Sequence, residues 1–326
     1  MNKLSSNKNS YVKPIGKALH PKNLHNHGYD FPVLIKSHQA LSTHVKTNKY
    51  NNESIDFSDP LAVKALNCAL LKHHYGIVEW DIPEGFLCPP IPGRVDYIHY
   101  IAELLEASHV GQNTAFNHPS IKLLDIGTGA NGIYSLLACQ VYGWHCTASD
   151  IDPLSLDNVA NIIDKNAALK NRLQLRLQHQ KNHIFEGIIQ AGDYFDVSVC
   201  NPPFHASLEE ALKTSQKKRD NLAINRNESS INIARKTTSV ANFGGQQAEL
   251  WCNGGERQFL RTMIKESKHF ANQCRWFTCL ISKSDNVKPA IKLLGKLEAV
   301  DIKQIEMKQG NKITRILAWT FLTSSV

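Results

Sequence analysis

The chain has 326 residues, of which 42% are hydrophobic, and it carries a formal net charge of +8 with a pI near 9.0. This length allows a full α/β core in about two domains, and the positive charge favours an anionic partner such as nucleic acid. No stretch approaches the ~18 consecutive apolar residues of a spanning helix, and residues 1–6 lack the apolar core of a signal peptide. We therefore expect a cytoplasmic protein that does not associate with membranes.

Cysteine and histidine are the residues that would reveal a metal site or a disulfide framework. The eight cysteines are scattered without a Cys-x-x-Cys pair, and the fifteen histidines lack metal spacing with a second ligand pair. We expect reduced, mostly buried thiols and no bound metal.

Residues 1–29 contain five lysines and no acidic residue, alongside Asn, Ser, Pro and His. This composition, with little apolar periodicity, predicts a flexible basic arm. Such an arm either contacts nucleic-acid phosphates or only keeps the chain soluble, and the sequence favours neither.

Residues 30–107 have a globular composition and predict a small, mainly helical subdomain. A helix is expected at residues 60–74. Its apolar face would consist of Leu61, Leu66, Ala69 and Leu70.

A proline-rich segment at residues 88–94 ends in Arg94 and leads to an expected helix at residues 97–108. The prolines predict a stiff, non-helical backbone, which would hold the Arg94 guanidinium against a carboxylate or phosphate. The alternative is a connector with a solvated arginine.

Residues 108–326 predict the larger domain. A strand at residues 121–126 runs into a glycine-rich turn, and a helix begins near Ile133. The glycine-turn residues are Asp125, Gly127, Thr128, Gly129 and Gly132. Glycines let the backbone approach a ligand at a helix N-terminus, so this turn is a candidate ligand site.

Asp150 follows the next predicted strand, residues 145–149. A carboxylate at that place can accept hydrogen bonds from ribose hydroxyls. A helix at residues 153–165 and a strand at residues 173–178 complete a βαβαβ order. Strand, glycine turn, helix, strand and acid together predict a nucleoside-binding unit in an α/β fold.

A fourth strand ends in Asn201-Pro202-Pro203-Phe204, which we expect to be the centre of the site. Alternating valines precede the turn, and its two prolines forbid continuation of the strand. Because ligands bind at the carboxyl ends of strands in open α/β sheets, this rigid turn would present Asn201 and Phe204 to a ligand. An amide, free carbonyls and an aromatic ring suit a planar heterocycle with an exocyclic amine.

Residues 205–248 interrupt the alternation of strands and helices with a basic insertion rich in Asn and Ser. Four of its residues, called the insertion cations below, are candidates for contacts with nucleic-acid phosphates. They are Lys213, Lys217, Lys218 and Arg219. The alternative roles for the insertion are a lid and a linker.

Regular elements resume after the insertion. A helix is expected at residues 256–270, a strand at 276–281 and a helix at 288–297. Apolar runs at residues 302–307 and 313–321 then predict a β-hairpin that closes the sheet with an antiparallel strand.

The glycine turn, Asp150 and the Asn-Pro-Pro-Phe sequence resemble those of class I methyltransferases that use S-adenosylmethionine. Three further segments, residues 54–60, 89–99 and 249–256, resemble the bacterial 23S ribosomal RNA adenine-N6 methyltransferases. Eukaryotic enzymes that methylate an adenine in spliceosomal small nuclear RNA are similar over the same core. The resemblance begins near residue 18 and implies a Rossmann-like fold with a mostly parallel seven-stranded sheet that ends in an antiparallel hairpin.

The resemblance also implies roles for residues. The glycine-turn residues and Asn201 would hold S-adenosylmethionine, with Asp150 on its ribose and Arg94 on its carboxylate. Asn201 and the Pro202 carbonyl would accept hydrogen bonds from the adenine N6 amine, while Phe204 stacks on the ring. The product would be S-adenosylhomocysteine. The partner would be 23S ribosomal RNA or an assembling large subunit, bound by a monomeric enzyme.

Other functions stay open at this point. Similar motifs occur in methyltransferases that act on guanine N2 of ribosomal RNA or on a glutamine of release factors. An oxidoreductase with a dinucleotide on the glycine turn would leave the Pro-Pro turn unexplained. A non-catalytic RNA-binding or assembly factor would also account for the basic segments.

Overall fold

The computed structural model describes residues 10–12, 18–48, 51–109, 117–203, 252–309 and 312–323. The predicted stacking residue Phe204, the insertion cations and the whole insertion at residues 205–248 lie outside this part of the chain. Within it, no helix is both long and apolar enough to cross a membrane.

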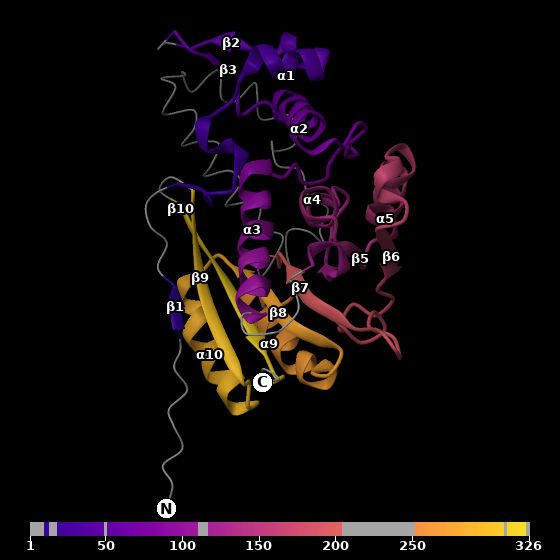
Figure 1. Ribbon diagram of the computed structural model, residues 1–326, viewed down its shortest axis with the longest axis vertical. Helices are drawn as coiled ribbons and strands as arrows, with labels where there is room; N and C mark the ends of the chain where they lie inside the picture. Colours follow the sequence, from indigo (N-terminus) through magenta and orange to yellow (C-terminus); the bar gives the residue numbers. More distant parts are fainter. Residues whose placement is uncertain are drawn as a thin grey trace, which may run out of the picture.

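One large sheet forms the centre of the fold (Figure 1), with the strand order β1-β9-β10-β8-β7-β4-β5-β6. Its strands are β1 (Ser10–Val12), β4 (Lys122–Ile126), β5 (His145–Asp150), β6 (Leu173–Leu177), β7 (Phe195–Cys200), β8 (Cys274–Ile281), β9 (Asp301–Gln309) and β10 (Lys312–Thr320). Strands β4 to β8 pair in parallel, whereas β10 is antiparallel to both β8 and β9. This confirms the predicted mostly parallel sheet with a C-terminal antiparallel hairpin.

Among the described residues, β1 adds an eighth strand to the seven expected ones, because it pairs in parallel with the outer edge of β9. β1 comes from the segment that we predicted to be a flexible arm. Its three residues lack the alternating pattern that identifies a strand in a sequence.

Helices precede, connect and follow the strands. They are α1 (Phe31–Ser37), α2 (Pro60–Tyr75), α3 (Ile91–Ser108), α4 (Ile133–Tyr142), α5 (Pro153–Lys165), α9 (Gly255–Ser267) and α10 (Val287–Lys296). Short 3-10 helices cover Leu24–His27, Gln39–Thr43, His118–Ser120, Ala167–Leu169, Lys268–Phe270 and Ser284–Asn286, and β2 (Lys46–Thr47) pairs with β3 (Glu53–Ser54).

The best-predicted helices carry their start signals in the sequence. Asp59 caps α2 by accepting a hydrogen bond from the Leu61 amide at 3.0 Å, and Asp152 caps α5 in the same way. A proline follows each cap, where its missing N–H costs nothing. These signals explain why both helices begin at the predicted residue.

Two predictions about the N-terminal subdomain are wrong in detail. Helix α3 begins at Ile91, so Arg94 lies in its first turn and not in a non-helical segment. Pro92 is compatible with this because prolines are tolerated in a first helical turn. On α2, Leu61 is 66% exposed and does not belong to the apolar face, which is formed by residues such as Ala62 and Leu66.

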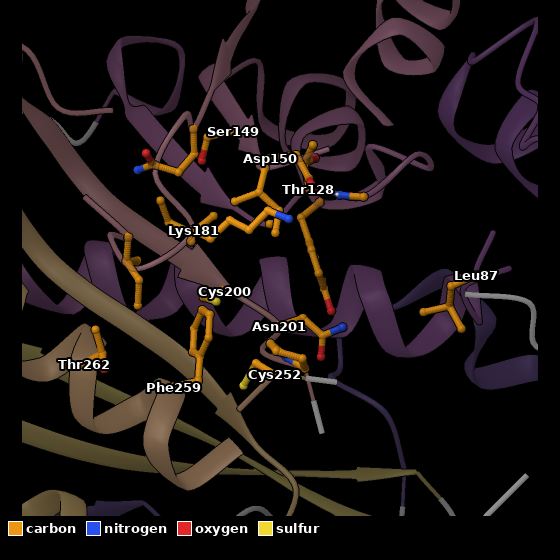
Figure 2. Close-up of a pocket in the computed structure, with 18 of the residues that line it drawn as sticks. Leu87, Thr128, Ser149, Asp150, Lys181, Cys200, Asn201, Cys252, Phe259 and Thr262 are labelled. Carbon is orange, nitrogen blue, oxygen red and sulfur yellow. Dashed lines mark hydrogen bonds between the residues drawn. The ribbon is translucent and has the colours of Figure 1, made fainter. Parts of the chain in front are cut away.

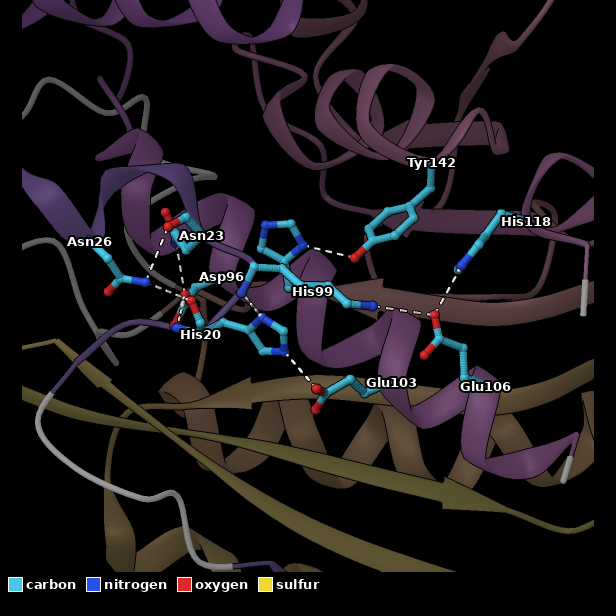
Figure 3. A network of polar contacts seen from close by, with 10 residues as sticks. His20, Asn23, Asn26, Asp96, His99, Glu103, Glu106, His118 and Tyr142 are labelled. Atoms are coloured by element: carbon cyan, nitrogen blue, oxygen red, sulfur yellow. Dashed lines mark hydrogen bonds and ion pairs between the residues drawn. The ribbon is translucent and has the colours of Figure 1, made fainter.

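Residues 18–29 also depart from the predicted arm, because they pack against α3 (Figure 3). Asp96 accepts hydrogen bonds from the His20 amide at 2.7 Å and from the Asn23 side chain at 2.8 Å. His20 and Asn23 are buried, and Asn23 also donates to the Pro92 carbonyl at 2.9 Å. Composition alone predicts a solvated segment, whereas the buried carboxylate of Asp96, 73 to 76 residues away, accepts specific hydrogen bonds from it.

The core has two layers, one on each face of the sheet. Along β10, Ile316 and Ala318 pack with the residues of α2, α3 and α4, whereas Leu317 and Trp319 pack with those of α9 and α10. Successive side chains of a strand point to opposite faces, so this alternation places the sheet between two helical layers. Figure 1 shows α3 running between the N-terminal helices and the β9–β10 hairpin. Because β4, β5, β6 and β7 pair in parallel, their carboxyl ends meet at one edge of the sheet.

Candidate active site

A cavity of about 430 Å³ lies at this edge of the sheet. It is lined by the glycine turn after β4, by Asp150 at the end of β5, by the segment after β6, by Asn201 after β7 and by α9. Figure 2 shows these side chains converging from their separate elements. The structure thus brings the predicted nucleoside unit and the predicted heterocycle turn into one cavity.

The glycine turn adopts a backbone that requires glycine. Gly127, Gly129 and Gly132 have φ angles of 69°, 63° and 59°, in the left-handed region. A Cβ atom on Gly132 would also lie 3.1 Å from a methyl of Val159. The amides of Gly127 and Thr128 donate to the Ser149 carbonyl at 2.9 and 3.0 Å, which ties the turn to β5.

Asp125 lies beneath the turn and is fully buried. Its Oδ2 accepts hydrogen bonds from the hydroxyls of Thr128 at 2.8 Å and Ser135 at 3.0 Å, while Oδ1 has no partner within the described residues. Burial is the main cause that raises the pKa of Asp125 to about 6. Asp125 is absent from the cavity lining, and its contacts with Thr128 and Ser135 support the turn from below.

Asp150 lines the cavity, as predicted from its strand-end position. Its carboxylate accepts hydrogen bonds from the Gly129 amide at 2.8 Å and the Asp152 amide at 2.9 Å. Burial raises its pKa, while these two amides lower it. The Ile151 amide also lowers the pKa, and because a carboxylate offers about four lone-pair positions, Asp150 keeps the capacity to accept a hydrogen bond from the cavity side.

Arg94 reaches the cavity from the first turn of α3. Its Nη1 donates to the Tyr134 hydroxyl at 2.5 Å, and the guanidinium carbon lies 5.4 Å from the centre of that ring. Its Nε is buried and has no hydrogen-bond partner in the described part of the chain. Because Nη1 is engaged, a carboxylate would bind Arg94 through the edge formed by Nε and Nη2.

The turn after β7 places Asn201 and Pro203 on the cavity wall, while Pro202 is buried. The Oδ1 atom of Asn201 is buried without a hydrogen-bond partner among the residues described. Leaving a buried acceptor unpaired costs free energy, typically ~1–3 kcal/mol. This atom therefore has the capacity to accept a hydrogen bond at the cavity wall.

Several cavity residues are not identified by sequence patterns, among them Tyr134, Lys181 and Phe259. Tyr134 stands in the first turn of the helix after the glycine turn, and that position was a usable signal. Lys181 and Phe259 reach the cavity through tertiary packing of separate elements, for which the sequence carries no local signal.

The segment that carries Lys181 is held by Glu266 on α9. The Glu266 carboxylate is buried and accepts hydrogen bonds from the amides of Ile184 at 2.9 Å, Phe185 at 2.8 Å and Glu186 at 2.5 Å. His183, Glu186 and Glu266 also place possible metal-ligand atoms within 4.8 Å of one another. Because Glu266 is already bound by three amides, its role here is to fix this wall of the cavity.

The sheet order, the antiparallel hairpin and the cavity at the carboxyl strand ends define a Rossmann-like class I methyltransferase. A family described as RNA methyltransferases matches residues 13–323, and the chain belongs to this family. Ribosomal RNA large subunit methyltransferase F of Shewanella halifaxensis is 55% identical over 324 residues, which cover 97% of this chain and 85% of that protein. The protein of the same name from Shewanella frigidimarina is 56% identical and covers 97% of this chain and 89% of its own length. The predicted family resemblance is confirmed.

Solved structures agree with this fold. The catalytic domain of hMettl16 in complex with the MAT2A 3′UTR hairpin 1 superimposes with a TM-score of 0.75 at 27% identity, covering 94% of this chain and 96% of that one. The N-terminal domain of human METTL16 in complex with SAH has a TM-score of 0.71 at 24% identity and covers 94% of this chain and 100% of that one. At this lower identity the likeness concerns the fold.

Proposed function

We propose that the protein transfers the methyl group of S-adenosylmethionine to N6 of an adenine in the RNA of the large ribosomal subunit. The observation that carries the proposal is the buried Oδ1 of Asn201, which has no hydrogen-bond partner among the described residues and lies at the cavity that also contains the glycine turn and Asp150. An amino group of a base would supply the missing donor. The names of the relatives, which are ribosomal RNA large subunit methyltransferases, support RNA as the acceptor.

The cavity fits S-adenosylmethionine on its chemistry. Asp150 can accept a hydrogen bond from a ribose hydroxyl, and Arg94, whose Nε has no partner among the described residues, suits the amino-acid carboxylate. The glycine turn lets the backbone approach the nucleoside closely. When bound, the cofactor would supply an electrophilic methyl group on a sulfonium.

Asn201 and the Pro202 carbonyl would accept hydrogen bonds from the adenine amine. The lone pair of this amine is delocalised into the ring, and hydrogen bonds to its protons favour a more pyramidal nitrogen. Phe204, which the structure does not describe, is proposed to stack on an adenine swung out of its neighbours. Holding nitrogen and methyl group in line corresponds to effective molarities of ~10⁵–10⁸ M, so no strong general base is required. The proton then leaves to water.

RNA would be held outside the cavity by basic residues. The insertion cations follow directly after the turn that carries Asn201, so contacts there would guide a strand toward the cavity. The formal net charge of +8 agrees with a polyanionic substrate. Specific binding of 23S ribosomal RNA, alone or in an assembling subunit, belongs to this proposal, as does the monomeric state.

The test is the chemical identity of the product. Large-subunit RNA from cells that lack the gene is incubated with the protein and S-adenosylmethionine carrying a labelled methyl group, then digested to nucleosides and analysed by mass spectrometry. We expect labelled N6-methyladenosine. Labelled N2-methylguanosine would show that guanine is the acceptor and not adenine. Label in a release-factor glutamine, tested in a parallel reaction, would show a protein acceptor. Binding of cofactor and RNA without any labelled product would indicate a non-catalytic assembly factor.

A further inference from the structure

Two buried tyrosines connect Arg94 with the turn that carries Asn201. Tyr134, in the first turn of α4, accepts a hydrogen bond from Arg94 Nη1 at 2.5 Å. The Tyr134 ring meets the ring of Tyr97 edge-on, with centroids 5.3 Å apart and an interplanar angle of 86°. Tyr97 lies three residues after Arg94 on α3, so the two project from neighbouring positions on one helix face.

The Tyr97 hydroxyl belongs to a chain of hydrogen bonds along the end of β7. Thr278 Oγ1 donates to the Ser198 carbonyl at 2.7 Å, which uses its hydroxyl proton, so the Tyr97 hydroxyl donates to Thr278 Oγ1 at 2.7 Å. The Tyr97 oxygen in turn accepts from the Cys200 amide at 3.4 Å. The paired residues of β7 and β8 end at Ser198 and Phe277, so the Cys200 amide that donates to Tyr97 lies beyond the hydrogen-bonded part of these two strands.

Burial makes each of these hydrogen bonds consequential. Tyr97 and Thr278 are fully buried, and Tyr134 is 4% exposed, so water does not replace a lost partner readily. Burial also raises the pKa of Tyr134 to about 12 and raises the pKa of Tyr97, so both phenols are neutral near pH 7. A neutral phenol can accept one hydrogen bond and donate another, as the Tyr97 hydroxyl does.

Resting on the proposed function, we infer that Tyr134 and Tyr97 are positioning residues for methyl transfer. Tyr134 fixes the guanidinium of Arg94 for the carboxylate of the methyl donor. Tyr97 holds the amide of Cys200, the residue before Asn201, and Asn201 would receive the acceptor amine. Their ring contact holds the two binding groups at a constant separation, and methyl transfer requires such alignment of donor and acceptor.

The two roles predict that removing each phenol oxygen changes a different quantity, cofactor affinity for Tyr134 and kcat for Tyr97. Tyr134→Phe should weaken S-adenosylmethionine binding about tenfold and raise its KM, with kcat changed less than about twofold, because a hydrogen bond to a charged group is lost. Tyr97→Phe should leave that affinity within about twofold and lower kcat at least about tenfold, because the turn loses its fixed placement. Affinity is measured by calorimetry without RNA, and kcat by methylation of large-subunit RNA.

Matched variants separate positioning from general destabilisation. Tyr142→Phe removes a phenol oxygen from the same helix as Tyr134, where it bonds His99 at 2.8 Å (Figure 3), and should leave both constants unchanged. Thr278→Val breaks the chain one link beyond Tyr97 and should lower kcat, whereas Thr278→Ser keeps the hydroxyl and should restore it. The Thr278 pair also serves if Tyr97→Phe does not fold.

Parental cofactor affinity and kcat in both Tyr134→Phe and Tyr97→Phe would overturn the inference. Equal losses of affinity and kcat that follow thermal stability, and that also appear in Tyr142→Phe, would overturn it as well. A parent protein that binds S-adenosylmethionine but methylates no RNA would refute the proposed function instead. In that case the calorimetric comparison of Tyr134→Phe with the parent still decides the role of Tyr134.

Discussion

The amide of Gly129 donates a hydrogen bond to Oδ2 of Asp150 at 2.8 Å, which joins the glycine turn after β4 to the end of β5. One carboxylate thereby shapes the turn and faces the cavity. The backbone that approaches the nucleoside and the group that would bind its ribose are thus placed by a single contact.

Asp150→Ala should weaken S-adenosylmethionine binding at least about tenfold, because charge-assisted hydrogen bonds to the ribose contribute ~1.5–3 kcal/mol each. Calorimetry on folded protein measures this. Asp152→Ala is the control, since Asp152 caps α5 and is absent from the cavity lining. That variant should lose some stability and keep its affinity. Equal affinities in Asp150→Ala and the parent would refute the ribose assignment.

Asp125 should make stability fall as the pH rises from about 4 to 6. Its pKa is raised to about 6 in the folded protein, so in this range the folded state keeps a proton that the unfolded chain has released. The stability is complete below the unfolded pKa and decreases by up to about 1.4 kcal/mol per pH unit through this window.

Asp125→Asn should remove this contribution, so the difference in unfolding free energy between parent and variant should shrink with rising pH. Urea titrations between pH 4 and 7 measure it. Asp157→Asn, which changes an exposed carboxylate on α5, is the matched control. A constant parent-to-variant difference across this range would contradict the raised pKa.

The parts of the site that follow local rules were predictable. Asp150 and Asn201 were found because a strand followed by a polar residue places that residue at the carboxyl edge of a parallel sheet. The glycine turn was found because left-handed backbone favours glycine. The caps before α2 and α5 fixed the starts of both helices.

The parts that were missed depend on contacts between distant residues. Glu266 accepts hydrogen bonds from amides that lie 80 to 82 residues away, and the amide of the buried His20 donates to Asp96 on α3. A lone glutamate on a helix or a histidine in a polar segment gives no sign of such a partner. The start of α3 was misplaced because its prolines suggested an extended chain, although a first helical turn also accepts them.

Replacing the insertion cations with Ala should reduce the salt dependence of RNA binding. Each phosphate contact contributes about −0.7 to the slope of log affinity against log salt for single-stranded RNA, so the slope should flatten by up to roughly 3. Filter binding over a series of salt concentrations measures it. A variant with exposed α10 lysines replaced, Lys288, Lys292 and Lys296, should keep the parental slope. An unchanged slope in the insertion variant would leave the insertion as a lid or linker.

Phe204→Ala should lower kcat/KM by roughly 5-fold to 150-fold, because a base–aromatic stack contributes ~1–3 kcal/mol. S-adenosylmethionine affinity should stay near the parental value, which separates stacking on the base from cofactor binding. Phe204→Tyr keeps an aromatic ring and should retain most activity. Full activity in Phe204→Ala would exclude stacking by this residue.

The central claim is that Asn201 orients the acceptor amine, and single-turnover methylation of large-subunit RNA by Asn201→Ala tests it most directly. At saturating S-adenosylmethionine the rate should fall on the order of a hundredfold, as for other polar groups that act mainly in the transition state. Thermal stability should stay close to that of the parent, and saturating S-adenosylmethionine keeps any change in cofactor affinity out of the measured rate. A folded Asn201→Ala protein that methylates its RNA at a near-parental rate would contradict the account.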